Sequence, residues 1–203
     1  MSKTKIIGLT GQTGAGKTVV CDMLTERGYK VINCDEVARS VVEKGRRCLM
    51  DLTIEFGTDI LNGDGTLNRK KLGEMVFSDK TRKKQMEKII FPHITREIDE
   101  MCDKLRESGE AAIFLDAPTL IESGVNKSCD KVVSVIAPPE DRFMRIVRRD
   151  GLTAEEAGRR MSAQHDDGYY TSASDFVIQN GGGMDDLTLK VLEMLDKLKI
   201  HNA

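Results

Sequence analysis

The chain's architecture follows from Gly11-Gln12-Thr13-Gly14-Ala15-Gly16-Lys17-Thr18, which matches the pattern GxxxxGK[ST] at every position. This segment directly follows the apolar run Lys5–Leu9 and precedes the amphipathic stretch Val19–Arg27. Its glycines let the backbone curl so that successive N–H groups point at phosphate oxygens, and a following helix adds the positive end of its dipole. The sequence therefore predicts a strand, a phosphate-binding loop and a helix, in that order.

Two side chains of this loop add chemistry to its backbone. Lys17 offers a positive charge to the outer phosphates of a nucleotide, and Thr18 offers a hydroxyl to Mg²⁺. The glycine spacing does not fit the dinucleotide pattern GxGxxG, in which Lys17 and Thr18 would have no purpose. We therefore expect ATP as the phosphoryl donor and Mg²⁺ as the metal. The expected ATP-binding residues here are Gly11, Thr13, Gly14, Ala15, Gly16, Lys17, Thr18 and Val19.

Four more short apolar runs have the pattern of strands buried on both faces. They are continuously apolar rather than alternating, and amphipathic stretches separate them, which is typical of a parallel sheet covered by helices. These runs are Tyr29–Ile32, Ala111–Leu115, Lys131–Ile136 and Phe176–Ile178. Together with the run before the loop, they predict an α/β fold with a five-stranded parallel sheet.

Helical patterns predict two additions to this core. The stretch from about 46 to 108 reads as nearly all helix, broken at 62–65 and near Pro92, and is expected to be an inserted helical subdomain. A second helical stretch, at about 139–171, is expected to form a lid. We expect one kinase-like domain over the whole chain, with its core at about 1–45, 109–138 and 172–203.

The composition excludes several classes of protein. Of the 203 residues, 31 are Lys or Arg and 33 are Asp or Glu, so the chain lacks the basic excess of a nucleic-acid-binding protein. No apolar run is long enough for a membrane span or a signal peptide, and five cysteines without a CxxC pair favour reduced thiols. We expect a cytoplasmic protein without nucleic-acid or membrane partners, as a monomer or a small homo-oligomer.

The surroundings of the loop favour a small-molecule kinase. A GTPase would need the guanine-reading pattern Asn-Lys-x-Asp, which the segment 126–130 misses by one residue. Arginines between Arg142 and Arg160 fall on two consecutive helical segments, where one face can close on a triphosphate, exclude water and neutralise charge. Two alternatives stay open: another P-loop kinase, acting on a nucleoside, a nucleotide or a sugar acid, and a nucleotide-dependent switch or binding module.

Two carboxylates follow predicted strands. Asp35 comes just after the second strand, and sites in such sheets lie at the carboxyl ends of strands, so Asp35 is expected to face the loop and orient an acceptor hydroxyl. The alternative is that Asp35 caps a helix that begins at Glu36. Asp116 ends the third strand and is expected to hold Mg²⁺, directly or through water.

From the loop onward, the chain resembles the dephospho-CoA kinase family along nearly its whole length. The segment Asn33-Cys34-Asp35-Glu36-Val37-Ala38-Arg39 is similar to the family signature Asp-Ala-Asp-x-x-Ala-Arg, with Asn33 in place of the first acid. Asp116-Ala117-Pro118-Thr119-Leu120-Ile121-Glu122 resembles its Pro-Leu-Leu-x-Glu segment. The stretch Arg145–Gln164 is similar to its lid, and Asp175–Gly181 resembles its final strand and adenine-side loop.

The resemblance implies a reaction and a set of roles. ATP and dephospho-CoA would give ADP and coenzyme A by phosphorylation of the ribose 3′-hydroxyl, the final step of coenzyme A biosynthesis, with the helical subdomain binding the acceptor. Asp35 would align this hydroxyl and take its proton late, and Asp116 is the other candidate for the proton acceptor. The catalytic residues would be Asp35, Lys17, Arg145 and Arg149. ATP binding would also involve Arg145, Arg160 and Asn180. The acceptor-binding residues would be Thr10, Asp35, Arg39, Asp116, Leu120 and Glu122.

The chain departs from the family at one further place. The family often has His-Pro where this chain has Phe91-Pro92-His93. No family role is therefore carried over to His93, which is expected at a helix boundary.

Overall fold

The computed structural model describes residues 4–77 and 79–201. Within it the chain forms two compact units, one made of residues 4–32 and 105–201 and the other of Asn33–Lys104. The first unit contains the phosphate-binding loop and the lid stretch, and the second contains most of the helical insertion. The limits of the substrate-binding subdomain, at about 46 and 108, stay predictions. The two compact units do not by themselves identify the residues that bind substrate.

Five strands form one sheet, in the order β2-β3-β1-β4-β5. Leu9 of β1 pairs with Asp116 of β3 and with Val133 of β4, and both pairings are parallel. The predicted five-stranded parallel sheet is therefore confirmed, with β1 at its centre. The strands are β1 (Lys5–Gly11), β2 (Lys30–Asn33), β3 (Ala112–Asp116), β4 (Lys131–Ile136) and β5 (Phe176–Gln179).

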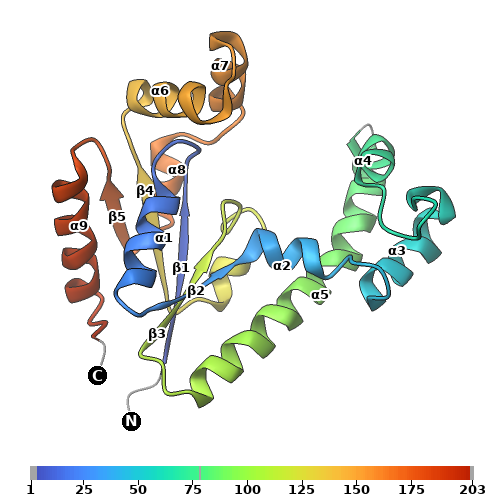
Figure 1. Cartoon of the computed structure of the whole chain (residues 1–203), viewed down its shortest axis with the longest axis horizontal. Coiled ribbons are helices and arrows are strands. Elements are labelled where there is room, and N and C mark those ends of the chain that lie inside the picture. The colour runs from blue at the N-terminus through green and yellow to red at the C-terminus, as the bar shows by residue number, and fades with distance from the viewer. Residues whose placement is uncertain (1–3, 78, 202–203) are drawn as a thin grey trace. The chain divides into compact units, whose positions relative to one another are not determined.

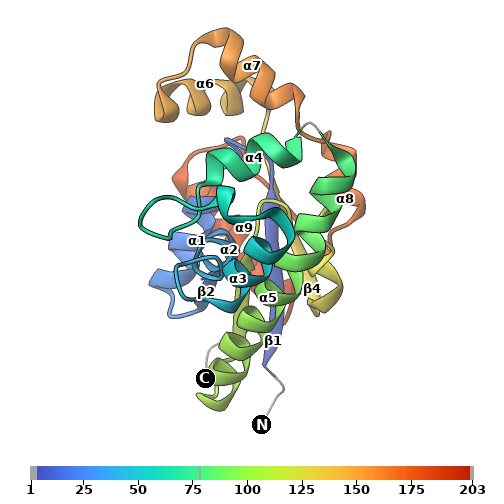
Figure 2. The same ribbon diagram turned by 90° about the vertical axis from the view of Figure 1, so that its right-hand side faces the viewer.

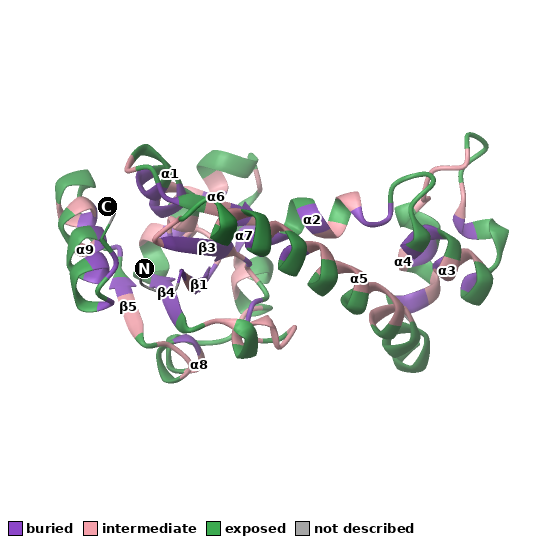
Figure 3. Cartoon of the chain, turned by 90° about the horizontal axis from the view of Figure 1, so that it is seen from below, coloured by how far each residue is buried: buried purple, intermediate pink, exposed green. Residues whose placement is uncertain are grey.

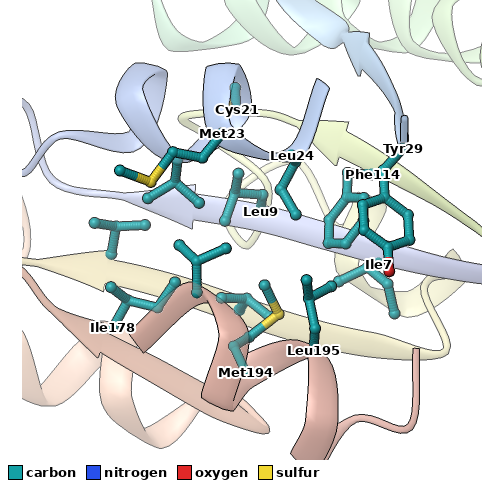
Figure 4. Close-up of a cluster of buried hydrophobic side chains, with 14 of the residues drawn as sticks. Ile7, Leu9, Cys21, Met23, Leu24, Tyr29, Phe114, Ile178, Met194 and Leu195 are labelled. Carbon is teal, nitrogen blue, oxygen red and sulfur yellow. The ribbon is translucent and has the colours of Figure 1, made fainter. Parts of the chain in front are cut away.

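The main core of the first unit lies between this sheet and two helices, α1 (Lys17–Glu26) and α9 (Met184–Lys197). Figure 4 shows side chains of both helices meeting those of the strands, among them Leu24, Phe114 and Met194. In Figure 3 the central strands carry the colour of buried residues, whereas α9 has both buried and exposed residues along its length. The buried face of α9 is thus a packing surface.

The lid stretch consists of α6 (Pro139–Asp150) and α7 (Ala154–Ser162), which lie beyond the carboxyl edge of the sheet in both Figure 1 and Figure 2. Thr153 and Glu156 form a capping box that begins α7. α7 ends at Ser162, well before the end of the predicted helical stretch at about 171. The Asp166 carboxylate instead caps a separate short helix, α8 (Asp167–Ser172), by accepting a hydrogen bond of 2.9 Å from Tyr169 N–H.

The second unit is mainly helical and contains a tight turn at 62–66. Asn62 and Thr66 close this turn with a backbone hydrogen bond of 2.8 Å, at the predicted break near 62–65. The remaining elements of the chain are α2 (Cys34–Ser40), α3 (Arg47–Phe56), the 3-10 helix η1 (Thr58–Ile60), α4 (Arg69–Phe77), α5 (Lys80–Glu107) and, in the first unit, the 3-10 helix η2 (Val125–Ser128).

The predicted break near Pro92 is wrong. α5 runs for 28 residues straight through Pro92, and His93 therefore lies inside a helix rather than at its boundary. Proline removes one N–H donor, so a helix of this length loses a single hydrogen bond, and the turns on both sides sustain the helix.

In the parts of the chain that the structure describes, no helix combines the length and the apolar character that a membrane crossing needs.

Candidate phosphate-binding site

The loop between β1 and α1 has the backbone curl that its glycines predict. Gly14 and Gly16 have φ angles of 78° and 96°, a region that residues with a side chain rarely adopt. A Cβ atom on Gly14 would lie only 2.7 Å from the Arg142 carbonyl oxygen, and one on Gly16 would collide with the Asn180 amide. Both positions therefore require glycine for conformation and for space.

Lys17 and Asp116 form an ion pair beside this loop, and their side chains are only 13% and 14% exposed. Lys17 opens α1, and Asp116 ends β3 in register with Leu9. The structure thus brings together the two residues that the sequence predicts for phosphate and Mg²⁺ binding. An incoming phosphate has to compete with the Asp116 carboxylate for the Lys17 ammonium group.

Cys21 lies one helical turn after Lys17, and its thiol is close enough to Asp116 to feel the charge of this carboxylate. Burial raises the pKa of the Cys21 thiol to about 12, and the negative charge of Asp116 adds to this effect. The side chain therefore stays a neutral thiol at physiological pH, near the carboxylate that pairs with Lys17.

The Thr13 peptide groups are held on two sides by the lid stretch. Thr13 N–H donates to Gln164 Oε1 over 2.9 Å, and Arg142 Nε donates to the Thr13 carbonyl oxygen over 3.0 Å. Arg142 Nη2 also donates to Gln164 Oε1 over 3.0 Å, which closes a ring of three hydrogen bonds. Arg142 is only 5% exposed, and this burial lowers its pKa from the usual value while Asp167 counteracts the shift.

Further bonds hold the rest of the loop from outside. The Gln12 amide donates to Asp167 Oδ1 over 2.9 Å and to the His165 carbonyl oxygen over 3.3 Å. The Asn180 amide donates to the Ala15 carbonyl oxygen over 2.8 Å. Asn180 is 6% exposed, so the structure assigns its side-chain amide to the loop backbone.

Arg145 is the predicted catalytic arginine that the structure brings to the loop. Its guanidinium donates to the Gly14 carbonyl oxygen over 3.3 Å and to the Asn180 carbonyl oxygen over 3.2 Å. A carboxylate on the preceding turn, Asp141, lies 3.8 Å away. The charge of Arg145 is thus positioned beside the predicted phosphate site.

Arg149 and Arg160 are held instead by one shared carboxylate. Arg149 binds Asp150 with two hydrogen bonds of 2.7 and 2.8 Å, and Arg160 donates to the same carboxylate. The hydrogen bonds from Arg149 and the charges of both arginines keep the pKa of Asp150 below its usual value. The two arginine side chains are 59% and 46% exposed, so water reaches them.

Three predicted acceptor-binding residues lie in different environments of the first unit. The Thr10 hydroxyl is buried and donates to the Pro118 carbonyl oxygen over 3.1 Å. Leu120 is fully buried and packs against Gly8. Glu122 is exposed, with His165 Nε2 3.8 Å from its carboxylate. Of the three, Glu122 alone presents a charged group to solvent.

In the second unit, α2 carries Asp35 in its first turn and Arg39 in its last. The helix is capped by Asn33, whose side-chain oxygen accepts bonds of 3.0 Å from Asp35 N–H and 3.2 Å from Glu36 N–H. The alternative that Asp35 is the cap is therefore wrong. Since Asn33 caps α2, the exposed Asp35 carboxylate is left available for another partner.

The second unit also contains an apolar pocket of about 380 Å³ between α2, α4 and α5. Phe77 and Phe91 line it although they are 87% and 40% exposed. Its lining also includes two cations, Arg69 and Lys83, and the carboxylate of Glu87. This combination suits a ligand that joins an apolar chain to an anionic group.

His93 contacts a neighbouring helix of the same unit. Its Nε2 lies 3.0 Å from Asp51 Oδ2 of α3, and Arg47 donates to the other oxygen of this carboxylate. Partial burial opposes ionisation of Asp51, but the bonds from His93 and Arg47 hold its pKa below the usual value. His93 thus links α5 to α3, as a residue with a structural role does.

Sequence reasoning assigned no role to Gln12, Gln164 or Asp167, which hold the loop in place. A glutamine in a polar helical stretch is ordinarily solvated, so its spacing alone carries no signal. Position 12 is a variable position of the GxxxxGK[ST] pattern. The role of these three residues can be recognised only from the contacts between the loop and the lid stretch.

Comparison with known proteins identifies the family to which the chain is similar. The family model described as dephospho-CoA kinase matches residues 5–186. A dephospho-CoA kinase of Listeria monocytogenes is 36% identical over 193 residues, which cover 95% of this chain and 96% of that protein.

Two solved structures are similar over nearly their whole length. Dephospho-CoA kinase from Campylobacter jejuni has a TM-score of 0.71 and 27% identity, and the match covers 95% of this chain and 96% of that one. The protein TT1252 from Thermus thermophilus has a TM-score of 0.83 and 30% identity, covering 97% and 99%. The similarity therefore includes the core, the helical insertion and the lid stretch.

Proposed function

The chain belongs to the dephospho-CoA kinase family, and from that premise we propose how its own residues perform the phosphoryl transfer. The enzyme phosphorylates the ribose 3′-hydroxyl of dephospho-CoA with ATP, which is the final step of coenzyme A biosynthesis. The observation that carries the proposal is the curled loop before α1, with the Lys17 ammonium group beside it. Positioning and charge neutralisation dominate this chemistry, because its transition state is loose.

The backbone of the loop and Lys17 bind the outer phosphates of ATP. The first N–H groups of α1 have no acceptor within the helix, and its dipole favours an anion there. Lys17 exchanges the Asp116 carboxylate for a phosphate oxygen, so its charge is already desolvated when the nucleotide arrives. Arg145 adds a second positive charge beside Gly14.

The donor set around the loop fits Mg²⁺. This ion prefers oxygen ligands and usually keeps waters while binding one or two protein groups and the phosphates of a nucleotide. The Thr18 hydroxyl and the Asp116 carboxylate are such oxygen groups, and Asp116 is released when Lys17 turns to a phosphate. When bound, Mg²⁺ would neutralise charge on the phosphate oxygens.

Asp35 aligns the acceptor hydroxyl and takes its proton late in the transfer. Aspartate is a weak base at neutral pH, so most of its effect comes from orientation. Its carboxylate is exposed and does not cap its own helix, because Asn33 does so. Arg39, one turn later on α2, contacts the acceptor from the same helix face.

The apolar pocket of the second unit takes the pantetheine arm of the acceptor. Pantetheine is a long chain of methylene and amide groups, and such chains gain binding energy by burying apolar surface. The exposed rings of Phe77 and Phe91 offer this surface, and Arg69 and Lys83 offer charge to the diphosphate. We therefore assign acceptor recognition to α2, α4 and α5.

A substrate panel tests the assigned reaction. Coupled ADP release is measured with dephospho-CoA, AMP, dTMP and gluconate as acceptors, and we expect turnover with dephospho-CoA alone. Turnover with one of the other acceptors would indicate another P-loop kinase. Nucleotide binding without release of any phosphorylated product would indicate a switch or binding module.

The role of Asp35 is tested by Asp35→Asn, with Glu36→Gln as the matched control. Both changes remove one carboxylate from the first turn of α2. We expect Asp35→Asn to lower kcat by about 100-fold or more, with a much smaller change in the KM for ATP. Glu36→Gln is expected to keep kcat within roughly twofold of the wild type. Near-normal turnover of Asp35→Asn would reject the assignment.

A further inference from the structure

We propose that Gln164 is a positioning residue for ATP: its side-chain oxygen holds both Thr13 N–H and the Arg142 guanidinium, and through Arg142 it sets the direction of a loop N–H group that receives the phosphates. Gln164 Oε1 accepts one bond from Thr13 N–H and one from Arg142 Nη2. A carbonyl oxygen has two lone pairs, so both bonds use the full accepting capacity of this atom. An amide at this place serves the loop without touching the nucleotide.

The planar peptide group couples the direction of each carbonyl oxygen to that of the next N–H group. In a trans peptide the C=O of one residue and the N–H of the next point in opposite directions. Arg142 binds the Thr13 carbonyl oxygen from the lid side, so the N–H of Gly14 must point away from the lid arginine. Asn180 binds the Ala15 carbonyl oxygen in the same way and turns the N–H of Gly16. These bonds turn the N–H groups of Gly14 and Gly16 away from the side chains that hold the loop.

Gln164 determines whether Arg142 can perform this task. Arg142 is 5% exposed, and a guanidinium at such a place needs acceptors for its N–H groups. Its Nε donates to the Thr13 carbonyl oxygen and its Nη2 donates to Gln164 Oε1. Loss of the Gln164 acceptor therefore leaves Arg142 under-satisfied and releases Thr13 N–H at the same time.

The same short segment also fixes the preceding residue of the loop. The His165 carbonyl oxygen and Asp167 accept from the Gln12 amide, and Gln12 is 3% exposed. Residues 164–167 follow α7 directly, so the end of the lid stretch forms one wall of the loop. The affinity for ATP thus depends on a segment outside the phosphate-binding motif.

The test compares Gln164→Leu with Gln164→Glu. Leucine has a similar size but no acceptor, whereas glutamate keeps oxygens for both donors and adds charge assistance to the bond with Arg142. The control is Gln85→Leu, which makes the same change at an exposed position of α5. Each protein is titrated with a non-hydrolysable ATP analogue by calorimetry without acceptor, and the KM values for ATP and dephospho-CoA are measured.

We expect Gln164→Leu to raise the Kd of the analogue and the KM for ATP by about tenfold, the size of one lost charged hydrogen bond. The KM for dephospho-CoA should stay within roughly twofold, and Gln164→Glu should stay within roughly threefold of the wild type. Gln164→Ala replaces the leucine variant if that protein does not fold. The proposal would be overturned if Gln164→Leu left the Kd of the analogue unchanged. It would also be overturned if Gln164→Glu raised this Kd as much as Gln164→Leu does. Because the titration contains no dephospho-CoA, its outcome is independent of the role given to Asp35.

Discussion

The arginines of the lid stretch fall into two groups that differ in what binds them. Arg142 and Arg145 donate to backbone carbonyl oxygens of the loop, and Arg142 is almost fully buried. Arg149 and Arg160 share the Asp150 carboxylate and remain about half exposed. A buried charge that loses its acceptors is costly, whereas an exposed ion pair contributes little. The loop backbone therefore holds the inner arginines in place, and we expect the exposed outer pair to exchange Asp150 for a phosphate.

Lys17→Ala is the reference for the arginine variants, because we expect it to lower kcat/KM more than any of them. Removing the ammonium group should cost about 2–4 kcal/mol of transition-state stabilisation, or a roughly 30- to 1000-fold loss in kcat/KM. Initial rates with ATP and dephospho-CoA measure it. A loss below about tenfold would mean that the charge on the phosphates is neutralised mainly by the arginines.

Arg142→Met tests the inner group. We expect the free energy of unfolding to fall by about 2–3 kcal/mol, because two charged hydrogen bonds disappear and their acceptors stay buried. Thermal unfolding should show a Tm lower by roughly 5–10 °C. The KM for ATP should rise as well. If Arg142→Met kept the Tm of the wild type, water would replace the guanidinium without cost. The two groups of arginines would then not differ in their contribution to stability.

Arg149→Met tests the outer group and should give the opposite pattern. We expect kcat to fall by about tenfold, equal to about 1.4 kcal/mol, while Tm stays within roughly 2 °C of the wild type. The control is Lys197→Met, which removes another exposed cation from an ion pair, in the last turn of α9. It should leave kcat unchanged. A lower Tm with a normal kcat for Arg149→Met would place this arginine among the structural ones.

Asp150→Asn gives the smallest effect and depends on pH. The pKa of Asp150 is depressed in the folded protein, mainly by the hydrogen bonds from Arg149. Its contribution to stability is therefore present above the unfolded pKa of about 3.9 and is lost as the pH falls through the lower, folded value. The difference in Tm between wild type and variant should shrink from pH 7 to pH 3. A difference that is constant with pH would exclude the ion pair as its cause.

Local patterns predicted the core of this fold well. The continuous apolar runs identify all five strands, because a parallel strand with helices on both faces has no polar side. The motif from Gly11 to Thr18 likewise fixed the place of the loop. These features depend on neighbours in sequence or on burial alone, which one sequence records directly.

Other features depend on contacts between distant segments and could not be read in this way. The helix through Pro92 continues because the surrounding turns outweigh one lost hydrogen bond, a balance that residue preferences do not contain. The bonds of Gln12 and Gln164 join positions more than 150 residues apart. The division of the arginines into two groups also emerges only from burial, since their sequence context is equally charged.

Asn33 has a consequence for how sequence motifs are compared. It stands where the family signature has its first acid, yet its side-chain oxygen begins α2 with two hydrogen bonds. Asparagine and aspartate start helices almost equally well. A substitution that looks like the loss of an acid from a reaction centre is thus an exchange between two equivalent helix starters. Signature positions of this kind report on the architecture of the chain, and a mismatch there is no argument against the activity.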